Sequence, residues 1–508
     1  MVEKIQFALL HYAQLTIFVV SCFGMGIWPI KSSKQLASID KIFSTCLTIT
    51  LGMGIFILAL QALGIFGLLN KFYVTVLLLT GHVGLLSNIA FQPRHGGRAP
   101  STQLSSEKAG LKMHWFFLGV LALIAIDMFP MPLHPPIDWD EVMYHLPHAR
   151  DWVTSGRLTI NEWLRYPLFP YNFNLLYSAG LSYGNEIFPH MVNALAGWLV
   201  AIGLFRLADS YFNRAVASIS VLLFVCLTLS QYGGAMADLG VALFVFFGFA
   251  CLFIWREKKN FPILCIAAFL IGVAAGIKYQ ALIFIPLFAV VVLLRERRPL
   301  HLLGLLMLFA LPCLYWYLRN YLIAGDPFNP MGARIFGYWG WNAGDMALQL
   351  ADIKRVADWP KVYIWPALGA VFLRSKFGYQ PFVAALVFSI YAFIVWIFTS
   401  HYSRSLMPAS AFIALLTAIV INHLYTQLIV RSNLTSSSLK SQFFIIAQNT
   451  LAALFLAVLG SAVFISSLKE WKSIQTTAEG RSSFLRTQIK SFEISEFLQH
   501  HPEYRVVQ

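Results

Sequence analysis

The stretch MADLGVALFVFFGFACLFIWREKKN (residues 236–260) decides the fold class of this chain. It is apolar from Leu239 to Trp255, close to the ~20 residues that a helix needs to cross ~30 Å of hydrocarbon. Because hydrocarbon offers no water to backbone N–H and C=O groups, such a segment must be helical. The segment ends in WREKKN (255–260), which is typical of a short loop on the inner side of a membrane.

The rest of the chain repeats this pattern. Of its 508 residues, 58% are hydrophobic and 12% are charged, whereas soluble proteins carry about 25% charged residues. We therefore predict an all-α, polytopic transmembrane bundle of about 12–14 spans. The predicted spans are 7–30, 43–68, 72–91, 113–132, 187–207, 213–231, 236–255, 261–277, 279–294, 301–319, 362–373, 381–399, 405–424 and 443–467.

Charge predicts which side each connection occupies. The formal charge of +14 is best explained by Lys and Arg that flank helices and set topology, so no nucleic-acid partner is expected. Short basic connections such as RERRPLH (295–301) and the link with Arg94 and Arg98 belong inside. Alternation of spans then places these segments outside: 133–186, 231–236, the region of residue 278, 320–361, 400–404 and the C-terminal tail.

We divide the chain into three parts. Residues 1–112 form N-terminal helices and an inside loop. Residues 113–425 form a membrane core with a structured first large outer loop, 133–186. Residues 426–508 form a linker, a last transmembrane helix and a short outer tail. The first part, with three helices that precede the core, has no role that the sequence indicates.

The outer loop begins with the most informative stretch, LHPPIDWDEVMYHLPHARDWVTSGRLTINEWLRYPLFPYNFNLLY (133–177). Asp138, Asp140 and Glu141 form an acidic cluster where the chain leaves the membrane. A carboxylate there can take a proton from an attacking hydroxyl or amine as a general base. Carboxylates can also hold a divalent cation that neutralises a phosphate leaving group. The plainer alternative is that these acids cap a helix and solvate the loop.

Residues 140–153 have the pattern of a helix that begins with acidic residues. On such a helix Asp140 and Tyr144 share a face, and so do Glu141 and His145. Each pair would present a carboxylate together with a phenol or an imidazole to one ligand.

Further charged residues stand in or beside apolar runs on the same predicted side. They are Asp238, Lys278, Arg319 and Arg404. Ionisable groups at membrane depth are energetically expensive, so each indicates a functional site. Taken singly, the cations could be snorkelling side chains at an interface. Taken with the acidic loop, charges from five separate segments are expected to meet on one face.

These residues resemble a known family, the GT-C membrane glycosyltransferases. The family includes protein O-mannosyltransferases, the lipid A aminoarabinose transferase and related enzymes that use lipid-carried sugars. The resemblance covers roughly residues 113–425 and rests on the order and common sidedness of several elements. These elements are WDEVMYH (139–145), YPLFPYNFNLLY (166–177), Asp238, GIKYQAL (276–282), LRNYLIAGDPFNP (318–330) and SRSLMPASAFIALL (403–416).

The resemblance implies a function: transfer of a sugar from a polyprenyl-phosphate donor, with inversion, to a lipid, glycan or protein acceptor at the outer face. It implies a bacterial inner membrane with the site on the periplasmic side. Asp140 would be the base, with Glu141 beside it, and Glu141 and Asp238 would shape the acceptor site or hold a divalent metal. The residues expected to contact substrate or phosphate are Asp138, Tyr144, His145, Asp238, Lys278, Tyr279, Arg319 and Arg404.

Two other functions remain open from the sequence. A transporter or flippase would also be polytopic with few charges, but it typically shows internal repeats and ionisable groups near the midplane. A non-catalytic scaffold of the same fold is the second alternative, because a fold does not guarantee an activity.

Overall fold

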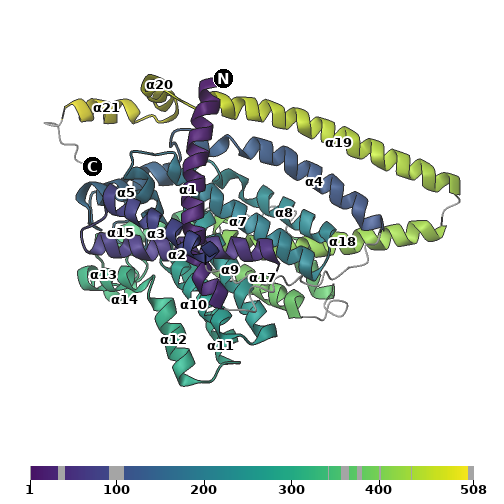
Figure 1. Cartoon of the computed structure of the whole chain (residues 1–508), viewed down its shortest axis with the longest axis horizontal. Coiled ribbons are helices and arrows are strands. Elements are labelled where there is room, and N and C mark those ends of the chain that lie inside the picture. The colour runs from purple at the N-terminus through teal and green to yellow at the C-terminus, as the bar shows by residue number, and fades with distance from the viewer. Residues whose placement is uncertain are drawn as a thin grey trace.

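The computed structural model describes residues 2–32, 40–90, 108–340, 342–355, 365–373, 380–399, 402–435 and 438–501. Every regular element within these residues is a helix, which confirms the predicted all-α bundle (Figure 1). Arg94 and Arg98, predicted on the inside, lie outside the described residues.

Within the described residues, eight helices are long and apolar enough to cross a membrane, so the chain is a multi-pass membrane protein. They are α1 (Val2–Ser32), α2 (Lys41–Ile65), α4 (Lys108–Met128), α7 (Phe188–Tyr211), α8 (Arg214–Thr228), α9 (Asp238–Lys258), α17 (Gln380–Phe398) and α18 (Ser410–Thr435). Shorter apolar helices are α3 (Lys71–Ala90), α10 (Phe261–Ala275) and the pair η5 (Tyr279–Phe284) and α11 (Ile285–Leu293). The long α19 (Ser438–Ser473) runs beside α4 along one edge (Figure 1).

One predicted span, 301–319, is wrong as a straight helix. The chain bends by 69° between α12 (Pro299–Ala310) and α13 (Leu314–Ala324). Pro312 lies in the break, where its missing N–H cannot continue the helix ladder. Its carbonyl oxygen instead accepts a 2.9 Å hydrogen bond from the Asn172 side chain. The bend therefore turns α13 toward the segment between α4 and α7.

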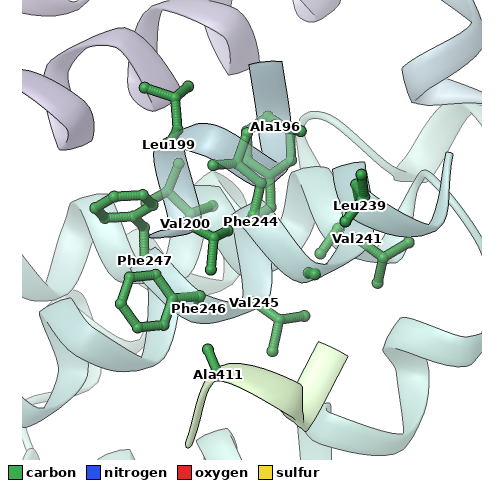
Figure 2. Packing of buried hydrophobic residues seen from close by; sticks show 14 of the residues in the cluster. Ala196, Leu199, Val200, Leu239, Val241, Phe244, Val245, Phe246, Phe247 and Ala411 are labelled. Carbon is green, nitrogen blue, oxygen red and sulfur yellow. The ribbon is translucent and has the colours of Figure 1, made fainter. Parts of the chain in front are cut away.

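The centre of the bundle is α9. Figure 2 shows Phe244, Val245 and Phe246 of this helix packed among residues of α7 and α18. A helix that is apolar on all sides is usually buried on all sides. The α9 helix follows this rule, because 94% of its most apolar 18-residue stretch is buried. Between membrane helices the association rests on close van der Waals packing. This packing holds the first residue of α9, Asp238, at a defined height.

The three N-terminal helices pack through glycines. A side chain at Gly52 of α2 would place its Cβ 1.7 Å from the Cys22 carbonyl oxygen of α1. A side chain at Gly24 would place its Cβ 1.8 Å from the Gly81 carbonyl oxygen of α3. Small residues let membrane helices approach this closely. The α1–α3 unit is therefore a tightly packed support for the core.

One end of the bundle, here called the site side, is organised by residues 129–187, which hold α5 (Leu146–Ser155) and α6 (Asn172–Leu181). The Asn172 N–H bonds to the Gly276 carbonyl oxygen at 2.7 Å, and Glu186 pairs with Arg481 of the C-terminal tail. The remaining short helices are α14 (Ala333–Phe336), α15 (Ala343–Arg355), α16 (Pro366–Gly369), α20 (Ala478–Gln488) and α21 (Phe492–His500).

Candidate active site

The chain enters the site through a wide helical turn, Glu141–His145. The Leu146 N–H bonds to the Glu141 carbonyl oxygen five residues back, which is the π-helical pattern. The α5 helix follows directly, with Pro147 in its first turn, where no N–H is needed. Single π turns are frequent at functional sites because they shift the side chains that follow.

Four charged side chains from four segments form the four-charge cluster: Asp140, Asp238, Lys278 and Arg404. An Arg404 guanidinium nitrogen lies 2.7 Å from Asp140 Oδ2, and Lys278 Nζ lies 2.9 Å from Asp238 Oδ2. Lys278 Nζ also donates to the Met236 carbonyl oxygen at 2.9 Å. Burial opposes the charge on Asp140, but Lys278 and Arg404 outweigh it and hold the pKa of Asp140 below its usual value.

The members of this cluster differ in exposure. Asp140 and Asp238 are buried, whereas the Arg404 side chain is 44% exposed. Gln280 donates to the backbone carbonyl oxygens of Arg404 and Ser405, which positions this turn beside η5. The exposed guanidinium is therefore the part of the cluster that an arriving ligand reaches first.

Glu141 has a different role from its neighbour. Its Oε1 accepts from the backbone N–H groups of Ile137 at 2.6 Å and Asp138 at 2.8 Å. Its Oε2 accepts from the Ala235 N–H at 2.7 Å and lies 2.8 Å from His190 Nε2. Burial opposes the charge, but His190 and these N–H groups outweigh it and lower the pKa of Glu141. We call this arrangement the Glu141 anchor; it joins the loop to α7 and to the turn before α9.

Asp138 lies next to the anchor. Burial, followed by the charge of Glu141, raises the pKa of the Asp138 carboxyl. A side chain at Gly234 would place its Cβ 2.2 Å from Asp138 Oδ2, so the turn before α9 requires glycine at this contact. Asp138 therefore packs against the same turn that the Glu141 anchor holds.

Of the two residue pairs predicted to share a helix face, the structure brings one together and separates the other. Tyr144 lies close enough to Asp140 to lower the pKa of its carboxyl, so these two residues do share a face. Glu141 and His145 do not share a partner, because the π turn is wider than the predicted α-helix. His145 Nδ1 lies 3.0 Å from Asn174 Oδ1. Burial lowers the pKa of His145 to about 3, so its imidazole is neutral at neutral pH.

The predicted ligands Arg319 and Tyr279 hold the loop around residue 168. Arg319 donates to the Phe169 carbonyl oxygen at 3.2 Å and to Asn320 Oδ1 at 3.0 Å. The Tyr279 hydroxyl donates to the Leu168 carbonyl oxygen at 3.2 Å, and Asn320 Nδ2 donates to the same oxygen at 2.5 Å. These contacts make Arg319 and Tyr279 supports of the loop backbone.

Sequence reasoning missed several supporting residues. His190, Asn172, Asn174 and Asn320 are all fully or almost fully buried. They fix the loop, the α13 turn or the Glu141 anchor through the contacts given above. The available signal was that polar side chains inside apolar runs are rare and tend to pair with one another.

The residues predicted for a divalent metal do not fit one. Within the described ranges, no group of three or more His, Cys, Asp or Glu side chains is placed to hold an ion. Glu141 already faces four donors, and Asp238 pairs with Lys278. Divalent cations of this kind require several free oxygen ligands. We derive no step of the chemistry through a metal.

Part of the chain matches a known family and a known protein. The family described as dolichyl-phosphate-mannose-protein mannosyltransferase matches residues 173–316. The uncharacterized Shigella flexneri protein SF2093/S2215 is 31% identical over 148 residues, which are 28% of this chain and 73% of that protein.

Two solved structures also align with the chain. ArnT from Cupriavidus metallidurans, bound to undecaprenyl phosphate, is 15% identical with a TM-score of 0.45, over 75% of this chain and 77% of ArnT. The Archaeoglobus fulgidus oligosaccharyltransferase is 15% identical with a TM-score of 0.40, over 70% of this chain and 56% of its own.

The family match lies within the region where the sequence motifs were found, and it contains Asp238, Lys278 and the helices that carry them. The chain is a multi-pass membrane protein of the same family as the Shigella protein SF2093/S2215.

Proposed function

We propose that the chain is a GT-C glycosyltransferase that moves a sugar from a polyprenyl-phosphate carrier to an acceptor hydroxyl or amine on the site side. The observation that carries the proposal is Asp140, a buried carboxylate whose pKa is lowered by Lys278 and Arg404. The matched family is described as using dolichyl-phosphate mannose, a donor of this chemical class. We further propose an inner membrane location with the site side facing outward, as the basic loops indicate.

The two cations suit the donor phosphate. Lys278 and Arg404 offer charge-assisted hydrogen bonds to phosphate oxygens, and a guanidinium fits two of them at once. Neutralising the charge that develops on the leaving phosphate is a large part of such catalysis. The lipid tail and the phosphate together fix the reacting carbon, so positioning supplies much of the remaining rate.

Asp140 would then complete the reaction. The acceptor oxygen or nitrogen attacks the anomeric carbon from the face opposite the phosphate, and its proton passes to Asp140. The bond from the anomeric carbon to the phosphate oxygen breaks, and its electron pair leaves with the polyprenyl phosphate. Attack on the opposite face gives inversion.

Arg404 links the two halves of this scheme. It pairs with Asp140 at 2.7 Å, and its partly exposed side chain can turn to a phosphate. When the phosphate takes the guanidinium, Asp140 loses one positive neighbour and becomes a stronger base. Donor binding would thus prepare the base for the acceptor.

The test is a transfer assay in membranes with a panel of radiolabelled polyprenyl-phosphate sugars. Wild type is compared with Asp140→Asn and with Asp151→Asn, an acid of the same loop that bonds to Thr159 instead of the cluster. We expect label to leave the carrier with wild type and Asp151→Asn, but not with Asp140→Asn. Equal transfer by Asp140→Asn would contradict the proposed base, and transport of an intact lipid-linked sugar would support the transporter alternative.

A further inference from the structure

A cavity separate from the four-charge cluster also lies on the site side. This partly open cavity of about 640 Å³ lies between residues 162–169 of the loop and residues 329–340 and 345–352 after α13. Small-molecule sites in proteins typically have volumes of about 300–1,000 Å³. Part of its lining belongs to two of the sequence motifs, residues 166–169 of the motif 166–177 and residues 329–330 of the motif 318–330.

The walls of the cavity combine rings with carboxylates. Tyr166 and Trp339 provide aromatic faces, and Glu162, Asp345 and Asp352 provide carboxylates. Aromatic rings pack on the apolar faces of sugar rings, and carboxylates accept hydrogen bonds from hydroxyl groups. This combination is suited to an oligosaccharide.

The charge of the cavity is opposite to what a phosphate needs. Among the described residues that line it, Arg165 alone is cationic, and this guanidinium already lies over the Trp139 ring at 5.0 Å and near the Tyr166 ring at 5.6 Å. Asp352 has an exposed partner, Arg355, at 3.3 Å. The excess of carboxylates disfavours anionic groups, because like charges brought together are strongly unfavourable at a binding surface.

The cavity adjoins the four-charge cluster through two rings in edge-to-face contact. Tyr166 lines the cavity, and its ring meets the Tyr144 ring at 5.1 Å. Tyr144 in turn lies close enough to Asp140 to lower the pKa of its carboxyl. The cavity and the proposed base are therefore neighbours, with the Tyr166 and Tyr144 rings between them.

We propose that this cavity is the acceptor site and that the acceptor is an oligosaccharide without phosphate or carboxylate groups. The inference rests on the proposed function and adds the acceptor class to it. Phosphate is directed to Lys278 and Arg404, while the acidic walls keep the donor phosphate out of the acceptor site. A basic peptide is the competing occupant, but the aromatic walls suit the apolar faces of sugar rings.

The experiment measures binding without any donor, so it does not depend on transfer. Labelled protein in nanodiscs is applied to an array of neutral, amino-bearing, phosphorylated and carboxylated glycans, with basic and acidic peptides beside them. The variants are Trp339→Ala, Glu162→Lys and the Glu162→Lys/Asp352→Lys pair. The control is Glu493→Lys, an exposed acid of α21 outside the cavity. Binding of polyprenyl phosphate is measured separately on every variant.

We expect wild type and Glu493→Lys to bind a subset of the non-anionic glycans. Each cavity variant should lose at least about tenfold in this affinity while its binding of polyprenyl phosphate is unchanged. The inference is overturned if no glycan binds, if the cavity variants bind glycans normally, or if anionic glycans or basic peptides are preferred. If wild type does not bind polyprenyl phosphate, the proposed function is contradicted. The glycan result would then still test whether the cavity binds glycans.

Discussion

Asp140 and Glu141 are adjacent in the chain, yet they serve two different regions of the molecule. Asp140 lies in the four-charge cluster, where it faces two cations, and the side chain of one of them, Arg404, is 44% exposed. Glu141 lies in the Glu141 anchor, is fully buried, and has both oxygens occupied by backbone N–H groups and His190.

The difference shows what a buried carboxylate needs in order to react. An oxygen that already accepts all its hydrogen bonds cannot take a proton without losing them, so Glu141 is suited to hold the loop in place. Asp140 has partners that a phosphate can replace. The region with exchangeable partners is expected to carry the chemistry, and the saturated region is expected to carry stability.

The largest effect is expected from Asp140→Asn. An amide cannot take the acceptor proton, so transfer should fall by about 10²–10⁴-fold, the usual contribution of a general base. The thermal melting temperature should change little, because the side chain keeps its shape. Transfer rates and melting curves on the same detergent-purified sample check this. A variant that melts far below wild type would place Asp140 with the anchor instead.

Glu141→Gln should have the opposite profile. The amide cannot accept from every N–H group that the carboxylate serves, so the free energy of unfolding should fall by about 2–4 kcal/mol. Transfer per folded molecule should remain within a fewfold of wild type. Glu186→Gln is the control, since its ion pair with Arg481 is partly exposed. Normal stability together with lost transfer would show that Glu141 takes part in the reaction.

The Glu141 anchor also predicts an acid limit of stability. The pKa of Glu141 is lower in the folded protein than its ordinary value of 4.5. Its stabilisation is therefore present above about pH 5 and is lost as the pH falls through the folded pKa. Melting temperatures between pH 3 and 7 should decline at the acid end for wild type, and the decline should be shallower for Glu141→Gln.

Arg404→Gln should give a smaller, two-part effect. Losing a charge-assisted contact to the phosphate should raise the donor KM by about 10–100-fold. Because Arg404 lowers the pKa of Asp140, its removal should also move the acid limb of the pH–rate profile to higher pH. The control is Arg214→Gln. Arg214 is the first residue of α8, its side chain is exposed, and it is not part of the four-charge cluster. An unchanged pH profile would separate Arg404 from Asp140.

Metal removal should have the smallest effect. Because the described residues do not fit a divalent ion, we expect transfer to stay within about twofold of normal after treatment with a chelator. A loss of tenfold or more that added magnesium or manganese restores would require a metal site assembled with substrate.

Two sequence features selected the residues of the candidate site. The cost of placing ionisable groups near hydrocarbon selected Asp238, Lys278 and Arg404, and the acidic cluster at the start of the outer loop selected Asp140. The same cost near hydrocarbon selected Arg319, although its guanidinium supports the loop carbonyl oxygens. Pattern alone cannot separate these cases, because both uses place a cation beside an apolar run. The sequence also did not show that the motifs 166–177 and 318–330 together line a cavity, because loop segments have no periodicity from which to predict how they meet.

By itself, the sequence determined that the chain is a helical membrane bundle with its charges gathered on one side, because hydrocarbon leaves the backbone and the ionisable groups few alternatives. Only the tertiary structure decided which of two adjacent acids faces the cations. The π turn at 141–145 and the bend after α12 depend on contacts between residues far apart in the chain. Such contacts depend on packing in three dimensions, which the order of residues does not display.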